Sequence, residues 1–180
     1  MKFTDEQRLI VMMLADIQKA LKINQEFDPD FISRAAAWKH EFAIGWKHQS
    51  IFDTSDTPEG FRFVIDVLDM FWFLENANGS LDESQRADLD ARLGWSTEGR
   101  LFDGFDGNNE PELRSYVRVA IDELGLFEDL KHDPRDDFNS HSPREDRYRA
   151  MLDVFLAIRP ELGDRRLNVD DLAAILSARR

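Results

Sequence analysis

The sequence of 180 residues contains no cysteine. This absence excludes a disulfide-stabilised scaffold, a catalytic thiolate and a zinc site built on cysteine, and it is compatible with a reducing compartment. A membrane-spanning helix needs roughly 20 mostly uncharged apolar residues, and no such run is present. The first residues also lack the pattern of a signal peptide. We therefore expect a cytoplasmic protein without a membrane segment.

Basic side chains are outnumbered, since 23 Lys and Arg face 36 Asp and Glu and the formal net charge is −13. A surface of this charge repels polyphosphate unless its basic side chains gather on one face. The composition therefore disfavours autonomous nucleic-acid binding. The general role of such a charge is to keep a protein soluble.

No segment alternates apolar and polar residues between hairpin turns, so no strand is predicted. Helix start signals are frequent instead. Thr4 with Gln7, Ser80 with Glu83, and Ser142 with Glu145 have the form of capping boxes, and Asp28-Pro29 places a capping carboxylate before proline. The sequence predicts an all-α protein of about six or seven helices. They are expected over residues 4–22, 28–42, 58–77, 80–94, 109–125, 142–159 (stopped by Pro160) and from 168, capped by Asn168 and Asp171, with 45–57 irregular or a short helix.

The segment 58–77 holds more large apolar side chains than any other part of the chain. Its charged residues Arg62, Asp66 and Asp69 are spaced by four and three, which places them in one narrow stripe of a helix. The rest of the circumference is apolar, so other helices must surround it. We predict a single compact domain, residues 1–180, built around this buried central helix.

The first expected helix carries apolar side chains at spacings of three and four, which is typical of an amphipathic helix. They are Ile10, Met13, Leu14, Ile17 and Leu21. We expect this stripe to be core, facing the central helix, in preference to a binding groove.

The segment 95–109 combines three glycines with aromatic residues and is expected to be a loop pinned by buried rings. Its Asp103, Asp106 and Asn108, followed by Glu110, suggest an oxygen-ligand cation site. An EF-hand beginning at Asp106 would require glycine where Pro111 stands. Capping and turn roles explain these residues better, and we expect neither a metal nor a cofactor.

The loops 104–110 and 138–141 each contain an aromatic anchor and each lead into a helix start. If those helices pack side by side, the two loops meet. We predict that Asp106, Glu110, Asn139 and His141 form a polar cluster there, in which carboxylates satisfy the N–H groups of two helix N-termini. The alternative is that the same side chains bind a ligand.

Several short motifs occur together in an order that resembles the YfbU-like family of small bacterial helical proteins. They are Thr4-x-x-Gln7-Arg8-Leu9-Ile10, Val64 to Met70, Gly104 to Asp106, Tyr116-Val117-Arg118, Phe138 to His141, Tyr148-Arg149-x-Met151-Leu152 and Leu167 to Leu176. Residues 22–57 and 80–94 carry no such match. The resemblance implies an all-α domain, and it implies no activity because the family is without an established one.

Two arginine–histidine pairs, each separated by five residues, are the candidate catalytic residues. Arg34-x5-His40 and Arg135-x5-His141 both fit the arginine-to-histidine spacing of HEPN-type ribonucleases, in which histidine serves acid-base chemistry and arginine stabilises phosphate charge. The stretch from Arg34 to His40 is expected to be helical. Such spacings arise often by chance. We therefore predict a non-enzymatic interaction or regulatory domain that binds a protein partner or itself, with a ribonuclease or other hydrolase as the alternative.

Overall fold

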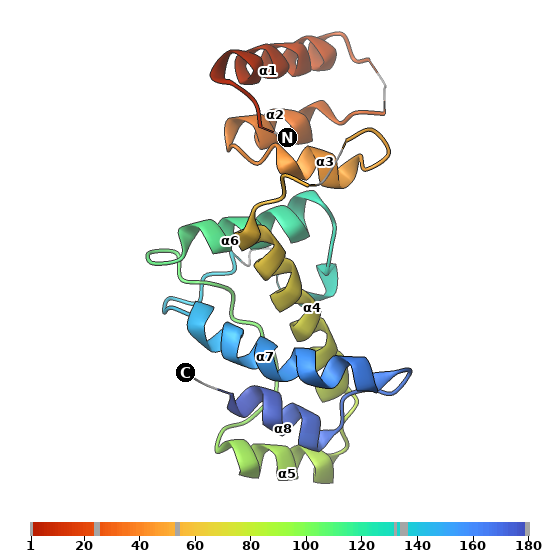
Figure 1. Cartoon of the computed structure of the whole chain (residues 1–180), viewed down its shortest axis with the longest axis vertical. Coiled ribbons are helices and arrows are strands. Elements are labelled where there is room, and N and C mark those ends of the chain that lie inside the picture. Colours follow the sequence, from red (N-terminus) through yellow and green to blue (C-terminus); the bar gives the residue numbers. More distant parts are fainter. Residues whose placement is uncertain (1, 24–25, 53–54, 132, 134–136, 179–180) are drawn as a thin grey trace. The chain divides into compact units, whose positions relative to one another are not determined.

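The computed structural model describes residues 2–23, 26–52, 55–131, 133 and 137–178 (Figure 1). Over these ranges the chain forms eight α-helices, one π-helical turn and one 3-10 turn. Extended pairing in the same ranges is limited to an isolated bridge between Phe105 and Asn139. The predicted all-α fold is confirmed. The additional helix, α3 (Phe42–Lys47), begins where the helix expected over 28–42 should have ended, and it overlaps only the first residues of the segment 45–57, for which an irregular chain or a short helix was expected.

Contacts divide the chain into two compact units. The N-terminal unit comprises Met1–Glu59 together with Asp122–Gly125, and the C-terminal unit comprises Gly60–Ile121 and Leu126–Arg180. The assignment of residues 1–180 to one domain stays a prediction. Within the part of the chain that the structure describes, no helix is long and apolar enough to cross a membrane.

The N-terminal unit contains three helices, of which α1 packs along α2 and α2 contacts α3. At the start of α1, the predicted capping box between Thr4 and Gln7 is present. At the start of α2, the Asp28 carboxylate accepts a hydrogen bond from the Asp30 N–H, as expected of a cap before proline. The bounds are α1 Asp5–Ala20, α2 Pro29–Ala37 and α3 Phe42–Lys47.

The expected helix over 28–42 is shorter than predicted, because α2 ends at Ala37. Lys39 adopts a left-handed conformation with φ of 60°. The His40 N–H then donates to Ala35 O at 2.8 Å and the Lys39 N–H to Ala36 O at 3.3 Å. This pair of hydrogen bonds is a Schellman motif, which terminates a helix. His40 therefore lies outside the helix that carries Arg34, and the expectation of one helix through both was wrong.

The C-terminal unit holds the remaining elements, in which α5 and α7 both pack against α8. Its bounds are α4 Glu59–Gly79 (from Gly60 onward in this unit), α5 Glu83–Leu93, α6 Pro111–Arg118, α7 Glu145–Leu162 and α8 Val169–Ser177, with a π-helical turn over Val119–Glu123 (up to Ile121 in this unit) and a 3-10 turn over Glu128–Leu130.

The central helix α4 is buried as predicted, with Val64, Val67 and Leu68 at 0 % exposure. Aromatic rings from distant parts of the chain pack around it. The ring of Phe71 lies 5.1 Å from Phe102 and 5.0 Å from Tyr148, centroid to centroid. Phe102 is fully buried, so the loop that carries it is pinned by its rings, as expected.

The predicted start of α5 and the predicted end of α6 were wrong. Ser80 does not cap α5, because its hydroxyl donates to Ala77 O and the capping box is made by Asp82 with Gln85. Asn168 and Asp171 do cap α8 as predicted. The helix expected over 109–125 is α-helical only to Arg118 and continues as the π-helical turn.

The helix expected over 142–159 is displaced toward the C-terminus at both ends. It begins at Glu145 with Arg144 as the N-cap residue, and no side chain of its own caps it. Pro160 lies inside its last turn and the helix ends at Leu162. Proline in the last turn removes only one helical hydrogen bond, so it does not stop the helix at once. Gly163, with φ of 52°, follows the last residue.

Candidate functional site

The loops 104–110 and 138–141 lie against each other, as the sequence predicts. The Phe105 N–H donates to Phe138 O at 3.0 Å, and the Ser140 N–H donates to Phe105 O at 3.2 Å. The side chains of Phe105 and Phe138 are both fully buried. The two loops are therefore joined by backbone hydrogen bonds and anchored in the same aromatic core.

Glu110 connects the start of α6 with the start of α7. Its Oε2 accepts the Asp106 N–H at 2.9 Å, and its Oε1 accepts the N–H groups of Arg144 and Glu145, each at 2.7 Å. The side chain is buried. A helix N-terminus leaves N–H groups without partners inside the helix and carries partial positive charge. Glu110 therefore caps α7 from a different segment of the chain.

Asp106 organises the turn that leads to α6. Its carboxylate accepts hydrogen bonds from the Asn109 side-chain amide and from the Asn108 N–H, the latter at 3.1 Å. These donors lower the pKa of Asp106, with the Asn109 amide as the largest cause. Asp106 is only 2 % exposed. The carboxylate is thus held in its ionised form by the donors of its own turn.

Asn139 bridges the two loops through its side-chain oxygen, which accepts the Gly107 N–H at 3.0 Å and the His141 N–H at 3.1 Å. The His141 side chain is exposed, and its backbone has φ of 54°. The side-chain oxygens of Asp106, Glu110 and Asn139 thus accept hydrogen bonds from N–H groups of the protein. The contacts fit the predicted capping network, while a binding role for Asp106, Glu110, Asn139 and His141 stays a prediction.

Arg34 and His40 are held by different groups within the N-terminal unit. Arg34 donates from Nε and from a terminal guanidinium nitrogen to the two carboxylate oxygens of Glu123, both at 2.8 Å. The His40 ring lies 6.5 Å from the ring of Trp38 and 5.9 Å from that of Phe42. Arg135 of the second such spacing lies outside the described residues. In the described ranges, no group of three or more His, Asp or Glu side chains could hold a metal ion.

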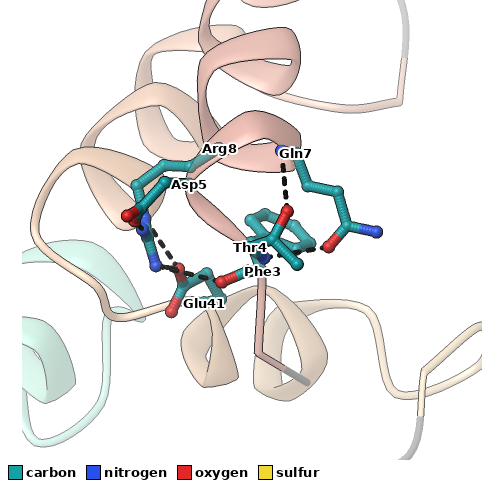
Figure 2. A network of polar contacts seen from close by, with 6 residues as sticks. All are labelled: Phe3, Thr4, Asp5, Gln7, Arg8 and Glu41. Carbon is teal, nitrogen blue, oxygen red and sulfur yellow. Dashed lines mark hydrogen bonds and ion pairs between the residues drawn. The ribbon is translucent and has the colours of Figure 1, made fainter.

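A charged network that the sequence analysis missed fixes the orientation of α1 (Figure 2). Arg8 donates to Glu41 Oε1 at 3.0 Å from Nε and at 2.5 Å from a terminal nitrogen. A second terminal nitrogen of Arg8 donates to Asp5 at 2.6 Å. Glu41 is only 4 % exposed. The side of α1 that carries Arg8 is therefore the side that faces the rest of the unit.

The apolar stripe of α1 is on the opposite side and is exposed, so the expectation that it forms core was wrong. Residues two apart on a helix point in nearly opposite directions, and residues seven apart point the same way. Arg8 and buried Ala15 thus face inward, while Ile10 and Ile17 face outward. The seven-residue spacing of Arg8 and Ala15 was the signal in the sequence for this orientation. The exposed members of the stripe are Ile10 (56 %), Met13 (57 %), Leu14 (59 %), Ile17 (52 %) and Leu21 (66 %).

An apolar pocket of about 310 Å³ opens beside this stripe within the N-terminal unit. Leu14 belongs to both the stripe and the pocket wall. Among the described residues that line it, the one polar side chain is Gln18, which donates to Phe27 O at 3.1 Å. Because Leu14 belongs to both, we treat the stripe and the pocket together and call them the α1 surface. It comprises Ile10, Met13, Leu14, Ile17, Leu21 and the pocket residues Val11, Gln18, Phe27, Ile32 and Phe52.

The chain is thus an all-α protein with a hydrogen-bonded polar cluster in one unit and a helix with an exposed apolar stripe in the other. It belongs to the YfbU family, since the YfbU domain matches residues 1–178. The resemblance described from the sequence motifs is therefore confirmed. A UPF0304 protein of the archaeon Methanocaldococcus jannaschii is 26 % identical over 151 residues, which are 83 % of this chain and 84 % of that protein.

Proposed function

We propose that this protein is a non-enzymatic interaction or regulatory domain that binds another protein chain through the α1 surface. The observation that carries the proposal is the exposure of the α1 stripe. Large contiguous apolar patches are uncommon on the surface of monomeric proteins and mark interaction sites. Of the large apolar side chains exposed in the described ranges, most lie between residues 9 and 23 of the N-terminal unit.

The polar cluster supports this role indirectly, because its groups already have partners within the protein. A general acid or base must reach the substrate, and a ligand site needs donors or acceptors directed at the ligand. The oxygens of Asp106, Glu110 and Asn139 instead accept N–H groups of neighbouring turns and helix starts. We propose that the cluster stabilises the fold and takes no part in chemistry.

Co-purification tests the proposal. The chain and an Ile10→Ser/Met13→Ser variant would be recovered from their source cells under identical conditions. We expect protein bound to the unmodified chain to be lost from the variant, while Asp16→Ser, a polar change on the same helix, retains it. Equal recovery with all three chains would contradict a role for the α1 surface. Fractionation of the same cells would test the proposed location in the cytoplasm.

The alternative of a hydrolase depends on Arg34 and His40. Arg34 would have to release Glu123 before it could stabilise a phosphate, and His40 follows the end of α2. We expect purified protein not to cleave RNA, and any weak activity to survive His40→Ala. Robust cleavage that is abolished by His40→Ala, or by His141→Ala as the other candidate, would replace the proposed function by its alternative.

A further inference from the structure

We infer that the partner of the α1 surface is a second copy of this chain, bound through antiparallel pairing of the two α1 helices. The inference rests on the proposed function and names its partner. Three features of the described residues favour a second copy over another protein. They are the spacing of the apolar side chains, the distribution of charge and the pocket beside the stripe.

The spacing of the stripe is that of a helix pair. Ile10, Met13 and Ile17 follow one another at intervals of three and four, and Ala20 continues the series. This average of 3.5 residues keeps one seam directed at a partner helix. A two-fold axis between Met13 and Leu14 would set Ile10 of one chain opposite Ile17 of the other. Each side chain then meets an apolar one, as a self-complementary interface requires.

The charge of the chain is unevenly distributed. Residues 1–23 carry four basic and three acidic side chains, whereas the whole chain has a net charge of −13. Two copies that meet through α1 therefore approach each other by a segment that carries no net negative charge. A basic partner would be drawn to the acidic remainder of the surface, since complementary charge steers association.

The ends of α1 also favour an antiparallel arrangement. The first turn carries Glu6 and also Asp5, which is paired with Arg8, while the last turn carries Lys19, which is paired with Asp30. Lys22 follows directly after the helix. Antiparallel pairing sets Glu6 of each chain near Lys22 of the other, and it opposes the two helix dipoles. Parallel pairing would place like charges together at both ends.

The pocket offers room for a side chain of the second copy. Its volume of about 310 Å³ is bounded almost entirely by apolar side chains. Because Leu14 lies between the pocket and the stripe, a helix that covers the stripe also reaches the pocket rim. A bulky side chain of the second copy can therefore be buried there, which adds apolar area to that of the two helices.

Sedimentation equilibrium of the full chain tests the association. We expect a dimer, and we expect Met13→Glu to weaken it at least about tenfold, because a carboxylate would be buried in an apolar interface. Gln7→Glu adds the same charge to α1, keeps the form of the capping box and should change the dissociation constant less than about twofold. Circular dichroism of both variants verifies that they are folded.

Cross-linking tests the register of the two α1 helices. Because the chain contains no cysteine, each introduced cysteine can pair only with another introduced cysteine. In an antiparallel pair, Met13→Cys lies beside its own copy and should form a disulfide-linked dimer on mild oxidation. Ile10→Cys should not link to itself, yet it should link to Ile17→Cys when the two proteins are mixed. Self-linking of Ile10→Cys with no linking to Ile17→Cys would indicate parallel pairing and overturn the inference.

The outcomes also separate the inference from the proposed function. A monomer at roughly 100 µM, or a dimer that Met13→Glu leaves intact, overturns the inference. If the chain is monomeric but Ile10→Ser/Met13→Ser still loses a co-purifying protein, the proposed function stands with a different partner. If it is monomeric and Met13→Glu lowers the melting temperature, the stripe is covered within one chain and both proposals fail.

Discussion

Gly104 shows how one residue decides whether the two loops of the polar cluster can meet. Its backbone has φ of 86°, and a Cβ built at this position would lie 2.1 Å from Phe138 O. The same segment carries the hydrogen bond from the Phe105 N–H to Phe138 O. Only a residue without a side chain allows both this conformation and this approach.

Gly104→Ala is therefore expected to destabilise the protein more than Gly99→Ala. Gly99 also has positive φ, at 94°, but nothing lies within 4 Å of its Cβ position. Gly99→Ala should cost about 1–2 kcal/mol from backbone strain alone. Gly104→Ala should cost about 1–3 kcal/mol more than Gly99→Ala, because the overlap of the new Cβ with Phe138 O can be relieved only by moving the backbone. Urea unfolding measures both, and equal losses would show that the close approach is unimportant.

Asp69 of the polar stripe on α4 pairs with Arg159, yet its ionisation is disfavoured. The carboxylate lies 2.8 Å from a guanidinium nitrogen of Arg159. Burial raises the pKa of Asp69 above 3.8, Arg159 opposes this rise, and Asp66 adds to it. A carboxyl group whose pKa is higher in the folded than in the unfolded state destabilises the fold once it is ionised.

Asp69→Asn is therefore expected to raise the melting temperature at pH 7 despite the loss of an ion pair. Well below a pH of 3.8 the carboxyl is protonated in both states, so the difference should vanish there, and it should grow as the pH rises from 3.8 to above the folded pKa. Asp88→Asn, in an exposed ion pair with Arg92, should have almost no effect. A lower melting temperature for Asp69→Asn at pH 7 would show that Arg159 outweighs burial.

At the scale of elements, α1 and α2 end in the same way. Lys22 and Lys39 adopt φ of 52° and 60°, and each is followed by a residue whose N–H reaches back into the helix. Glycine is the usual residue at such a position because it has no Cβ. Lysine is not a recognised helix stop signal, which is why the helix predicted over 28–42 is longer than the observed α2.

Lys39→Gly is expected to stabilise the protein by roughly 1 kcal/mol, because it removes the strain of a left-handed lysine. Ala37→Gly, two residues earlier in an exposed helical position, should instead destabilise it by about 0.5–1 kcal/mol. Thermal unfolding of the two variants should therefore give shifts of opposite sign. Two shifts in the same direction would contradict the assigned end of α2.

Glu110 shows that a helix can be capped by a residue from a different element. Its carboxylate takes the first N–H groups of α7, a role that Ser142 was expected to play. Glu110→Gln should destabilise the protein by about 1–3 kcal/mol, since it removes a buried charged acceptor. Glu98→Gln, an exposed change in the same unit, should be almost neutral. Equal stability of the two variants would contradict the capping role.

At the scale of the whole molecule, the two units differ in how they bury their helices. In the N-terminal unit α1 buries Ala15 alone, whereas in the C-terminal unit most apolar side chains of α4 are buried. Helices with few buried contacts open at lower free energy than core helices. We expect the amides of α1 to exchange with deuterium faster than those of α4 in dilute protein.

Pairing of two chains would add a concentration dependence to this difference. Exchange in α1 should slow as the protein concentration rises, because association stabilises the bound form, while α4 should be unaffected. Mass spectrometry of peptic fragments at several concentrations measures both helices in one experiment. If α1 is as protected as α4 in the most dilute sample, the stripe is not a free surface.

The sequence by itself determined the helical class, the central helix and the capping boxes at Thr4 and Asn168. These features depend on local signals, namely the period of apolar residues and the few residue types that can satisfy the first N–H groups of a helix. The contact between the loops 104–110 and 138–141 was also predictable, because each loop carries an aromatic anchor beside a helix start. Both anchors, Phe105 and Phe138, are fully buried.

Only the tertiary structure decided which side of α1 faces inward. The helix has two faces that can pack, and the apolar one was the natural choice for a core. Glu41, far along the chain, instead binds Arg8 and turns the apolar stripe outward. Glu110 likewise replaces Ser142 as the cap of α7. In both cases a carboxylate distant in sequence supplies the partner, and local patterns carry no information about which distant groups the fold brings together.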